Sequence, residues 1–126
     1  MDRKSVSILI PCYNEEQCLS SLFEAIEPIC AHCSEIEWTL LFVNDGSRDA
    51  TKAMLEHYLW GSKSWCHGKI IDLSRNFGKE AAIIAGLDHC KTDACVIMDA
   101  DLQDPPELIP KMILKWLEGA QIVSAR

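Results

Sequence analysis

The stretch that decides the fold is Val6-Ser-Ile-Leu-Ile10, followed by Pro11-Cys-Tyr-Asn-Glu15 and by an apolar stripe over residues 18–26. The β-branched run predicts a buried strand that Pro11 ends. Asn14 is placed to cap a helix, and apolar residues spaced three and four apart predict the helix itself. A buried strand, a polar turn and an amphipathic helix form the first part of a βαβ unit.

The same order recurs along the chain. Further strands are expected at 38–43, 70–73, 94–98 and 121–124, a loop at 61–68, and helices after Asp49, at 78–90 and after Asp104. Strict alternation of strands and helices predicts an α/β fold, Rossmann-like, with a mainly parallel sheet and helices on both faces. The helix at 78–90 is apolar almost all round, so we expect it to be buried.

Composition and charge exclude several classes of protein. The chain has 126 residues, 48% of them hydrophobic, which suits one globular domain. With 12 Lys and Arg against 19 Asp and Glu, the formal net charge is −7, which argues against nucleic acid as a partner. No apolar run approaches the length of a membrane span and no signal peptide is recognised, so we expect this chain to be soluble and cytoplasmic.

Seven cysteines are many for this length. An odd number without a signal peptide is typical of reduced thiols rather than of a disulfide scaffold. Cys30-Ala-His-Cys33 has the spacing of half a zinc site, and only Cys66-His67 could complete it. One such pair without a second is a weak signal, so a structural zinc is not expected.

The polar residues gather where the predicted strands end. Charged or amide side chains follow all four strands, in Pro11-Cys-Tyr-Asn-Glu15, Asn44-Asp-Gly-Ser-Arg-Asp49, Ser74-Arg-Asn-Phe-Gly-Lys-Glu80 and Asp99-Ala-Asp-Leu-Gln-Asp104. In parallel sheets ligands bind beyond the carboxyl ends of the strands, so this convergence predicts a functional site. For Asn14, Asp49 and Asp104 we expect helix capping to be the main role.

Asp99-Ala-Asp101 directly follows the buried strand 94–98. Two carboxylates spaced by two residues project to one side of an extended segment and repel each other unless a cation lies between them. Oxygen ligands without nearby His or Cys favour Mg²⁺ or Mn²⁺, and the amide oxygen of Gln103 could be a third ligand. The alternative is a solvated acidic loop followed by a helix cap.

Asp45 and Gly46 form the second candidate piece of the site. A carboxylate at this strand end can accept a hydrogen bond from a nucleobase, and Gly46 lets the backbone turn close by, although a simple turn is the alternative. No phosphate-binding loop of the G-x-x-x-x-G-K or G-x-G-x-x-G type is present. Phosphates would therefore need a metal together with Arg75, Lys79 or Arg126.

Taken together, these motifs resemble those of family 2 glycosyltransferases of the GT-A fold, over the whole chain. Pro11-Cys-Tyr-Asn-Glu15, Asn44-Asp-Gly-Ser-x-Asp49 and Asp99-Ala-Asp101 mark the superfamily. Ser74-Arg-Asn-Phe-Gly-Lys-Glu80 and the segment 99–107 resemble more specifically its polyprenyl-phosphate branch, which includes bactoprenol glucosyltransferases and dolichol-phosphate mannose synthase. Asn44 departs from the pattern, because many relatives carry an aspartate there.

The resemblance implies an inverting transfer of a sugar from a UDP-sugar, UDP-glucose being favoured, to a polyprenyl phosphate such as undecaprenyl phosphate, with Mg²⁺ or Mn²⁺ as cofactor. It implies that Pro11, Tyr13, Glu15, Val43 and Asp45 hold the base and ribose, that Asp99, Ala100, Asp101 and Arg126 meet the diphosphate, and that Asp99, Asp101 and Gln103 bind the metal. Asp99 and Asp101 are the residues expected to carry catalysis.

On this interpretation residues 1–126 are the nucleotide-sugar-binding part of a GT-A domain that is incomplete at its C-terminus. The parent protein is then expected at the cytoplasmic face of the cell membrane, and whether it forms a homo-oligomer is left open. The alternative is a non-catalytic nucleotide-sugar-binding module without an acceptor half. A receiver-like regulatory domain is disfavoured, because Leu73 is followed by Ser74-Arg75 instead of a phosphoacceptor aspartate.

Overall fold

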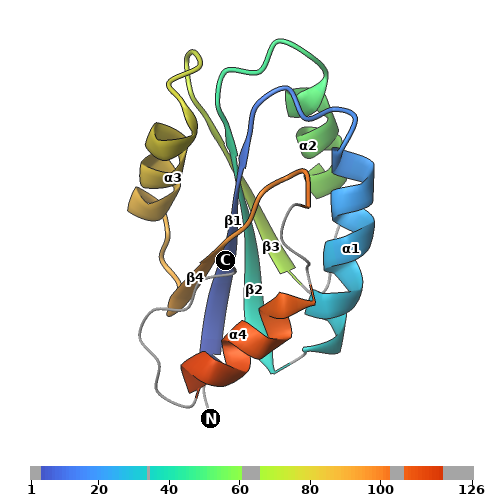
Figure 1. Cartoon of the computed structure of the whole chain (residues 1–126), viewed down its shortest axis with the longest axis vertical. Coiled ribbons are helices and arrows are strands. Elements are labelled where there is room, and N and C mark those ends of the chain that lie inside the picture. Colours follow the sequence, from blue (N-terminus) through green and yellow to red (C-terminus); the bar gives the residue numbers. More distant parts are fainter. Residues whose placement is uncertain (1–3, 34, 61–65, 103–106, 118–126) are drawn as a thin grey trace.

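A computed structural model describes residues 4–33, 35–60, 66–102 and 107–117. Within them the strands are β1 (Lys4–Cys12), β2 (Ile36–Asn44), β3 (Cys66–Asp72) and β4 (Ala94–Ile97), and the helices are α1 (Leu19–His32), α2 (Thr51–Trp60), α3 (Lys79–Asp88) and α4 (Leu108–Leu117). The strands form one parallel sheet in the order β3-β2-β1-β4 (Figure 1). The predicted α/β architecture is confirmed.

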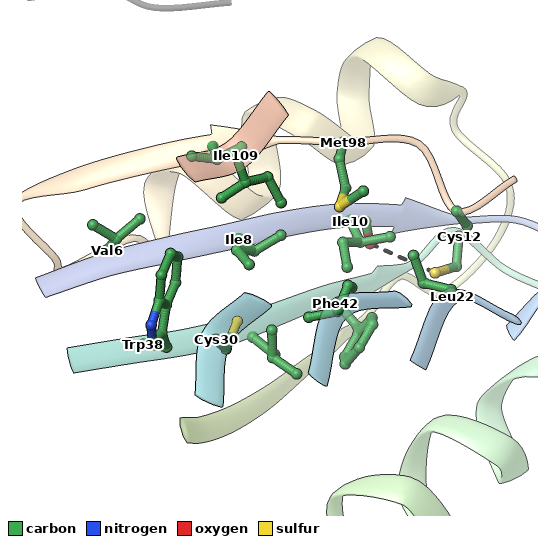
Figure 2. Close-up of a cluster of buried hydrophobic side chains, with 14 of the residues drawn as sticks. Val6, Ile8, Ile10, Cys12, Leu22, Cys30, Trp38, Phe42, Met98 and Ile109 are labelled. Carbon is green, nitrogen blue, oxygen red and sulfur yellow. Dashed lines mark hydrogen bonds between the residues drawn. The ribbon is translucent and has the colours of Figure 1, made fainter. Parts of the chain in front are cut away.

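The helices cover the two faces of the sheet unequally. The larger core cluster lies on one face, where α1, α2 and α4 pack against alternate residues of β1, among them Val6, Ile8 and Ile10 (Figure 2). The smaller cluster lies on the other face, where Leu9 packs with Ala82 of α3. Since side chains alternate across a strand, β1 contributes to both cores and is the buried centre of the sheet.

The predicted burial of the helix at 78–90 is wrong. Of α3, only Ala82 and Gly86 are buried, whereas the side chains of Ile84 and Leu87 are 60% and 44% exposed. No other described helix lies on this face, so nothing in the described residues covers the outer side of α3 (Figure 1). Gly86 lets α3 lie close to β1, because a Cβ there would be 2.5 Å from Cδ1 of Leu9.

β1 does not end at Pro11 as predicted but continues to Cys12. The Leu9 carbonyl accepts a hydrogen bond from the Met98 N–H, so the backbone groups of Leu9, and of Pro11 two residues later, are directed toward β4. The pairing of β1 with β4 ends at Leu9. Pro11 therefore removes no hydrogen bond from the sheet, which is why a proline is tolerated in this central strand.

The start of α1 also differs from the prediction. α1 begins at Leu19, without a side-chain cap, and Asn14 lies in a turn with a φ of 52°. The Asn14 Oδ1 accepts a hydrogen bond from the Arg48 N–H at 2.8 Å, so it joins the loops that follow β1 and β2. The cap predicted at Asp49 is confirmed, since its Oδ1 accepts the Thr51 N–H at 2.9 Å where α2 begins.

The last part of the chain is described as far as α4. Its predicted apolar stripe is confirmed for five residues: Ile109, Met112 and Ile113 are buried, and Leu108 and Trp116 pack partly buried against the larger core cluster. β3 begins at Cys66, inside the segment predicted as a loop. The predicted strand at 121–124 and the cap at Asp104 lie outside the described residues. Of the described helices, none is long and apolar enough to cross a membrane.

Candidate functional site

The loops that follow β1, β2 and β3 lie at the top of Figure 1, and the residues after the shorter β4 line the same cleft as these loops. They enclose a cleft of about 360 Å³, lined by Pro11, Cys12, Tyr13, Glu15, Asp45, Asn76, Gly78, Lys79, Asp99, Ala100 and Asp101. The chain leaves β1 over one face and enters β4 over the other, so these neighbouring strands form the topological switch point of the sheet. Ligands of open α/β sheets bind at such a point.

Eight of the residues predicted for the site line this cleft: Pro11, Tyr13, Glu15, Asp45, Lys79, Asp99, Ala100 and Asp101. Val43 does not line it, because its side chain is fully buried in the smaller core cluster beside Leu41. Gln103 and Arg126 lie outside the described residues. The residues predicted to converge at the strand ends therefore do lie together in the cleft, except for Val43, whose side chain does not reach it.

Asp45 is 2% exposed, and its carboxylate holds the loop that follows β3. Its Oδ1 accepts the Phe77 N–H at 2.8 Å, and its Oδ2 accepts the Gly78 N–H at 3.0 Å and the side-chain amide of Asn76 at 3.1 Å. The Asp45 N–H itself donates to the Cys12 carbonyl at 2.8 Å. Asp45 thus joins the loops after β1, β2 and β3, a structural role that the sequence did not reveal.

Gly46 makes this junction sterically possible. Its φ is +68°, and a Cβ built on it would lie 2.3 Å from the backbone carbonyl carbon of Arg75. The loop after β3 therefore runs against Gly46 at a distance that no other residue type allows. Gly78 also has a positive φ, of +104°, but a Cβ there would meet nothing within 4 Å, so its requirement for glycine is conformational alone.

An ion pair crosses the other side of the cleft. The Nζ of Lys79, the first residue of α3, contacts Oδ1 of Asp99 in the loop after β4. The Asp99 side chain is 13% exposed, whereas that of Lys79 is 48% exposed. Since half-exposed ion pairs stabilise a fold by about 1 kcal/mol or less, this contact matters more for the charge of the cleft than for stability.

The carboxylates give the cleft an excess of negative charge. Burial raises the pKa of Glu15, and the nearby charge of Asp101 raises it further. The pKa of Cys12, which also lines the cleft, is raised to about 12 by burial and by Glu15, so its thiol stays neutral and is a poor nucleophile. A positive ion is the kind of ligand that would relieve this repulsion.

The described residues test whether a divalent cation fits here. No three His, Cys, Asp or Glu side chains in this part of the chain form a metal site by themselves. Asp99 and Asp101 nevertheless offer hard oxygen ligands in one cleft, and the ammonium of Lys79 already lies against one of them. Mg²⁺ and Mn²⁺ are often held by one or two carboxylates together with substrate phosphates, and the donor set fits such a shared ion.

The sequence matches the family described as Glycosyl transferase family 2 over residues 7–126. The chain belongs to glycosyl transferase family 2. An uncharacterized family relative, glycosyltransferase YkcC of Bacillus subtilis (strain 168), is 47% identical over 120 residues, which are 94% of this chain and 36% of the relative. The bactoprenol glucosyl transferase of Shigella phage SfX is 37% identical over 123 residues, which are 96% of this chain and 38% of that protein.

A solved structure shows the same fold. The mannosyltransferase PcManGT from Pyrobaculum calidifontis, in complex with GDP-Man and Mn²⁺, superposes with a TM-score of 0.77 at 21% sequence identity over 96% of this chain and 34% of its own. The Rossmann-like GT-A fold implied by the resemblance is confirmed. The family 2 chain spans a little more than one third of the length of these relatives.

Three residues of this family 2 cleft were not singled out from the sequence. Cys12, Asn76 and Gly78 line it, two of them in the loop after β3. The signal that could have found the loop residues is their place in Ser74-Arg-Asn-Phe-Gly-Lys-Glu80, directly after a strand end. That position indicates proximity to the site, but the pairing of the loop with Asp45 depends on how the strands are ordered in the sheet.

Proposed function

We propose that this chain is the donor-binding part of an inverting glycosyltransferase that moves a sugar from a UDP-sugar to a polyprenyl phosphate such as undecaprenyl phosphate. The observation that carries the proposal is the convergence of Asp45, Asp99, Asp101 and Lys79 on one cleft, at the switch point of a family 2 sheet. The name of the phage relative, bactoprenol glucosyl transferase, supports a lipid acceptor and favours UDP-glucose as the donor.

The base and ribose would lie between the loops after β1 and β2, held by Pro11, Tyr13, Glu15 and Asp45, with Val43 at the end of β2. A carboxylate has about four acceptor positions, and the loop after β3 uses three of those on Asp45. The fourth, on Oδ1, is left for the N–H of a nucleobase. Asp45 can therefore hold the loop and contact the base at the same time.

The diphosphate would lie over Asp99, Ala100 and Asp101, with Mg²⁺ or Mn²⁺ held by Asp99, Asp101 and Gln103, and with Arg126 as a further cation. The metal, when bound, neutralises charge on the departing nucleoside diphosphate. An oxygen of the acceptor phosphate forms a bond to the anomeric carbon while the bond from that carbon to the diphosphate breaks, which releases UDP and inverts the centre. Because a phosphate oxygen is already ionised at neutral pH, the reaction needs no strong general base.

In the whole protein this reaction would serve the modification of cell-surface polysaccharide or lipopolysaccharide. The acceptor is a membrane lipid, so we place the parent protein at the cytoplasmic face of the cell membrane. The present chain would supply the donor site, and the acceptor would be bound by parts of the parent protein outside it. This division agrees with the one third of the relatives' length that the chain spans.

Calorimetry tests the donor site directly. The chain, shown to be folded by circular dichroism, is titrated with UDP, GDP and UDP-glucose, each with and without Mn²⁺. We expect UDP and UDP-glucose to bind only with Mn²⁺. Asp101→Asn should lose this Mn²⁺-dependent binding, whereas Asp88→Asn, on the exposed side of α3, should retain it. A folded chain that binds none of the nucleotides in the presence of Mn²⁺ would overturn the proposal.

The acceptor is tested with the full-length protein. Membranes or detergent micelles that contain undecaprenyl phosphate and radiolabelled UDP-glucose should yield a labelled lipid product that depends on Mn²⁺ or Mg²⁺. Nucleotide binding by the full-length protein with no transfer to the lipid would instead favour a non-catalytic nucleotide-sugar-binding module.

A further inference from the structure

Lys79 occupies a position where its charge competes with that of a metal ion. Its Nζ contacts Asp99, and Asp99 is one of the two carboxylates proposed above to hold the cation. Both residues line the same cleft. Two positive ions cannot share one carboxylate without repelling each other, so binding of a divalent ion at Asp99 favours the departure of the ammonium.

We propose that Lys79 is an exchangeable counter-ion of the donor site. Without donor it neutralises Asp99, and when the metal binds Asp99 the ammonium moves to the diphosphate of the incoming nucleotide. This inference rests on the proposed function, because it needs a metal and a diphosphate in the cleft. It assigns a donor contact to Lys79, which the sequence offered only as one of three cations available to phosphates.

The fold holds the backbone at Lys79 while leaving its side chain free to move. The preceding residue, Gly78, donates its N–H to Asp45 at 3.0 Å, and Lys79 begins α3. The Lys79 side chain is 48% exposed and has a flexible four-carbon stem, whereas Asp99 is largely buried. A shift of the ammonium from Asp99 to a phosphate in the same cleft therefore needs only side-chain rotation. Asp45 acts here as a positioning residue.

The other cations near the site have different partners. Among the described residues that line the cleft, Lys79 is the only Lys, Arg or His. The guanidinium of Arg75 lies over the ring of Phe77, 4.7 Å from its centroid. Lys52 pairs with Asp72 at 3.0 Å and does not line the cleft. Among the described residues, Lys79 is thus the cation that lines the cleft proposed to hold the diphosphate.

The test compares Lys79→Met with Lys52→Met, which removes a half-exposed lysine from a Lys–Asp ion pair outside the cleft and so serves as a control. Binding of Mn²⁺ alone is followed by the electron paramagnetic resonance of the free ion, and UDP is then titrated at saturating Mn²⁺. We expect Lys79→Met to bind Mn²⁺ about threefold more tightly and UDP about tenfold more weakly. Lys79→Arg should restore most of the affinity for UDP.

The affinity for uridine separates phosphate binding by Lys79 from a purely structural role, because a structural role would lower the affinity for uridine as well. Uridine carries no phosphate, so all variants should bind it equally well, and thermal melts should agree between Lys79→Met and Lys52→Met. A loss of uridine affinity equal to the loss of UDP affinity would overturn the inference, as would a Lys79→Met protein that binds UDP like the control.

The outcomes also separate this inference from the proposed function. If the parent chain binds UDP only with Mn²⁺ but Lys79→Met behaves like Lys52→Met, the donor site stands and the role of Lys79 is refuted. If the folded parent chain shows no Mn²⁺-dependent UDP binding, both are refuted.

Discussion

Asp45 follows β2 and Asp99 follows β4, the strands on either side of β1, and both line one cleft, yet they have different kinds of partner. Asp45 is buried and accepts three hydrogen bonds from a loop of its own protein. Asp99 contacts the ammonium of a half-exposed lysine. Neutral N–H groups fixed in a loop cannot leave, whereas a flexible ammonium can be replaced by another cation. The first carboxylate is suited to building the site and the second to exchanging ligands.

Removal of the buried carboxylate should have the largest effect on stability. Asp45→Ala leaves two backbone N–H groups without their acceptor and leaves the Asn76 amide only the backbone carbonyl of residue 45, so we expect a loss of about 3 kcal/mol in the free energy of unfolding. Urea denaturation measures it, with Asp88→Ala as an exposed control that should change by less than about 0.5 kcal/mol. Equal stabilities for the two variants would show that Asp45 does not hold the loop.

A side chain at Gly46 should separate the same two loops by sterics. Gly46→Ala places a Cβ against the backbone of Arg75 at a positive φ, so we expect a loss of about 2 kcal/mol. Gly78→Ala meets open space, so only its conformation, with a φ of 104° and a ψ of 158° that almost no residue but glycine adopts, opposes the change, and a loss of about 1 kcal/mol is expected. Urea denaturation that ranks the two variants in the reverse order would contradict the close approach at Gly46.

A change at Asp101, which lines the cleft close to Asp99 in the sequence, should affect ligand binding and leave the fold unchanged. Asp101 is exposed, so Asp101→Asn should alter the free energy of unfolding by less than about 0.5 kcal/mol. The affinity for UDP in the presence of Mn²⁺ should fall at least about tenfold, because a metal ligand loses its charge. Calorimetry and urea denaturation on the same preparation check both parts, and a large loss of stability would remove the contrast with Asp45.

The smallest expected effect is a pH dependence at Glu15. Burial and the nearby charge of Asp101 raise the pKa of Glu15 above its ordinary value of 4.5. As the pH rises, the unfolded chain releases this proton first, so the stability from Glu15 is present below pH 4.5 and is lost as the pH passes the raised pKa. Glu15→Gln should therefore gain stability relative to the parent chain between pH 4 and pH 7, as measured by urea midpoints. A constant difference over that range would refute the raised pKa.

The contrast between the two carboxylates also marks where prediction from the sequence ends. Asp45 and Asp99 were both recognised as strand-end residues, since each follows an apolar run. The partners of Asp45 lie 31 to 33 residues further along the chain, and no local pattern relates them. They meet because β3 lies beside β2 in the sheet. The two carboxylates could thus be named from the sequence as residues of one cleft, but their different partners could not.

The two faces of the sheet give the same lesson for the fold. The apolar stripe of α4 correctly predicted a helix packed on a core, whereas the apolar composition of α3 wrongly predicted burial. An apolar stripe predicts which side of a helix packs against the core. Apolar residues all round a helix do not predict how many of its sides are covered by other elements. In the described residues, α3 has the sheet on one side only, and Ile84 remains exposed.

The sequence by itself determined the alternation of strands and helices, the parallel sheet and the polar strand ends, because hydrophobic periodicity and turn chemistry are properties of neighbouring residues. The tertiary structure alone decided that Asp45 holds the loop after β3, that Lys79 meets Asp99, and that Pro11 continues a central strand. Each of these depends on the order of strands in the sheet and on the direction of single backbone groups, which bring together segments that are distant along the chain.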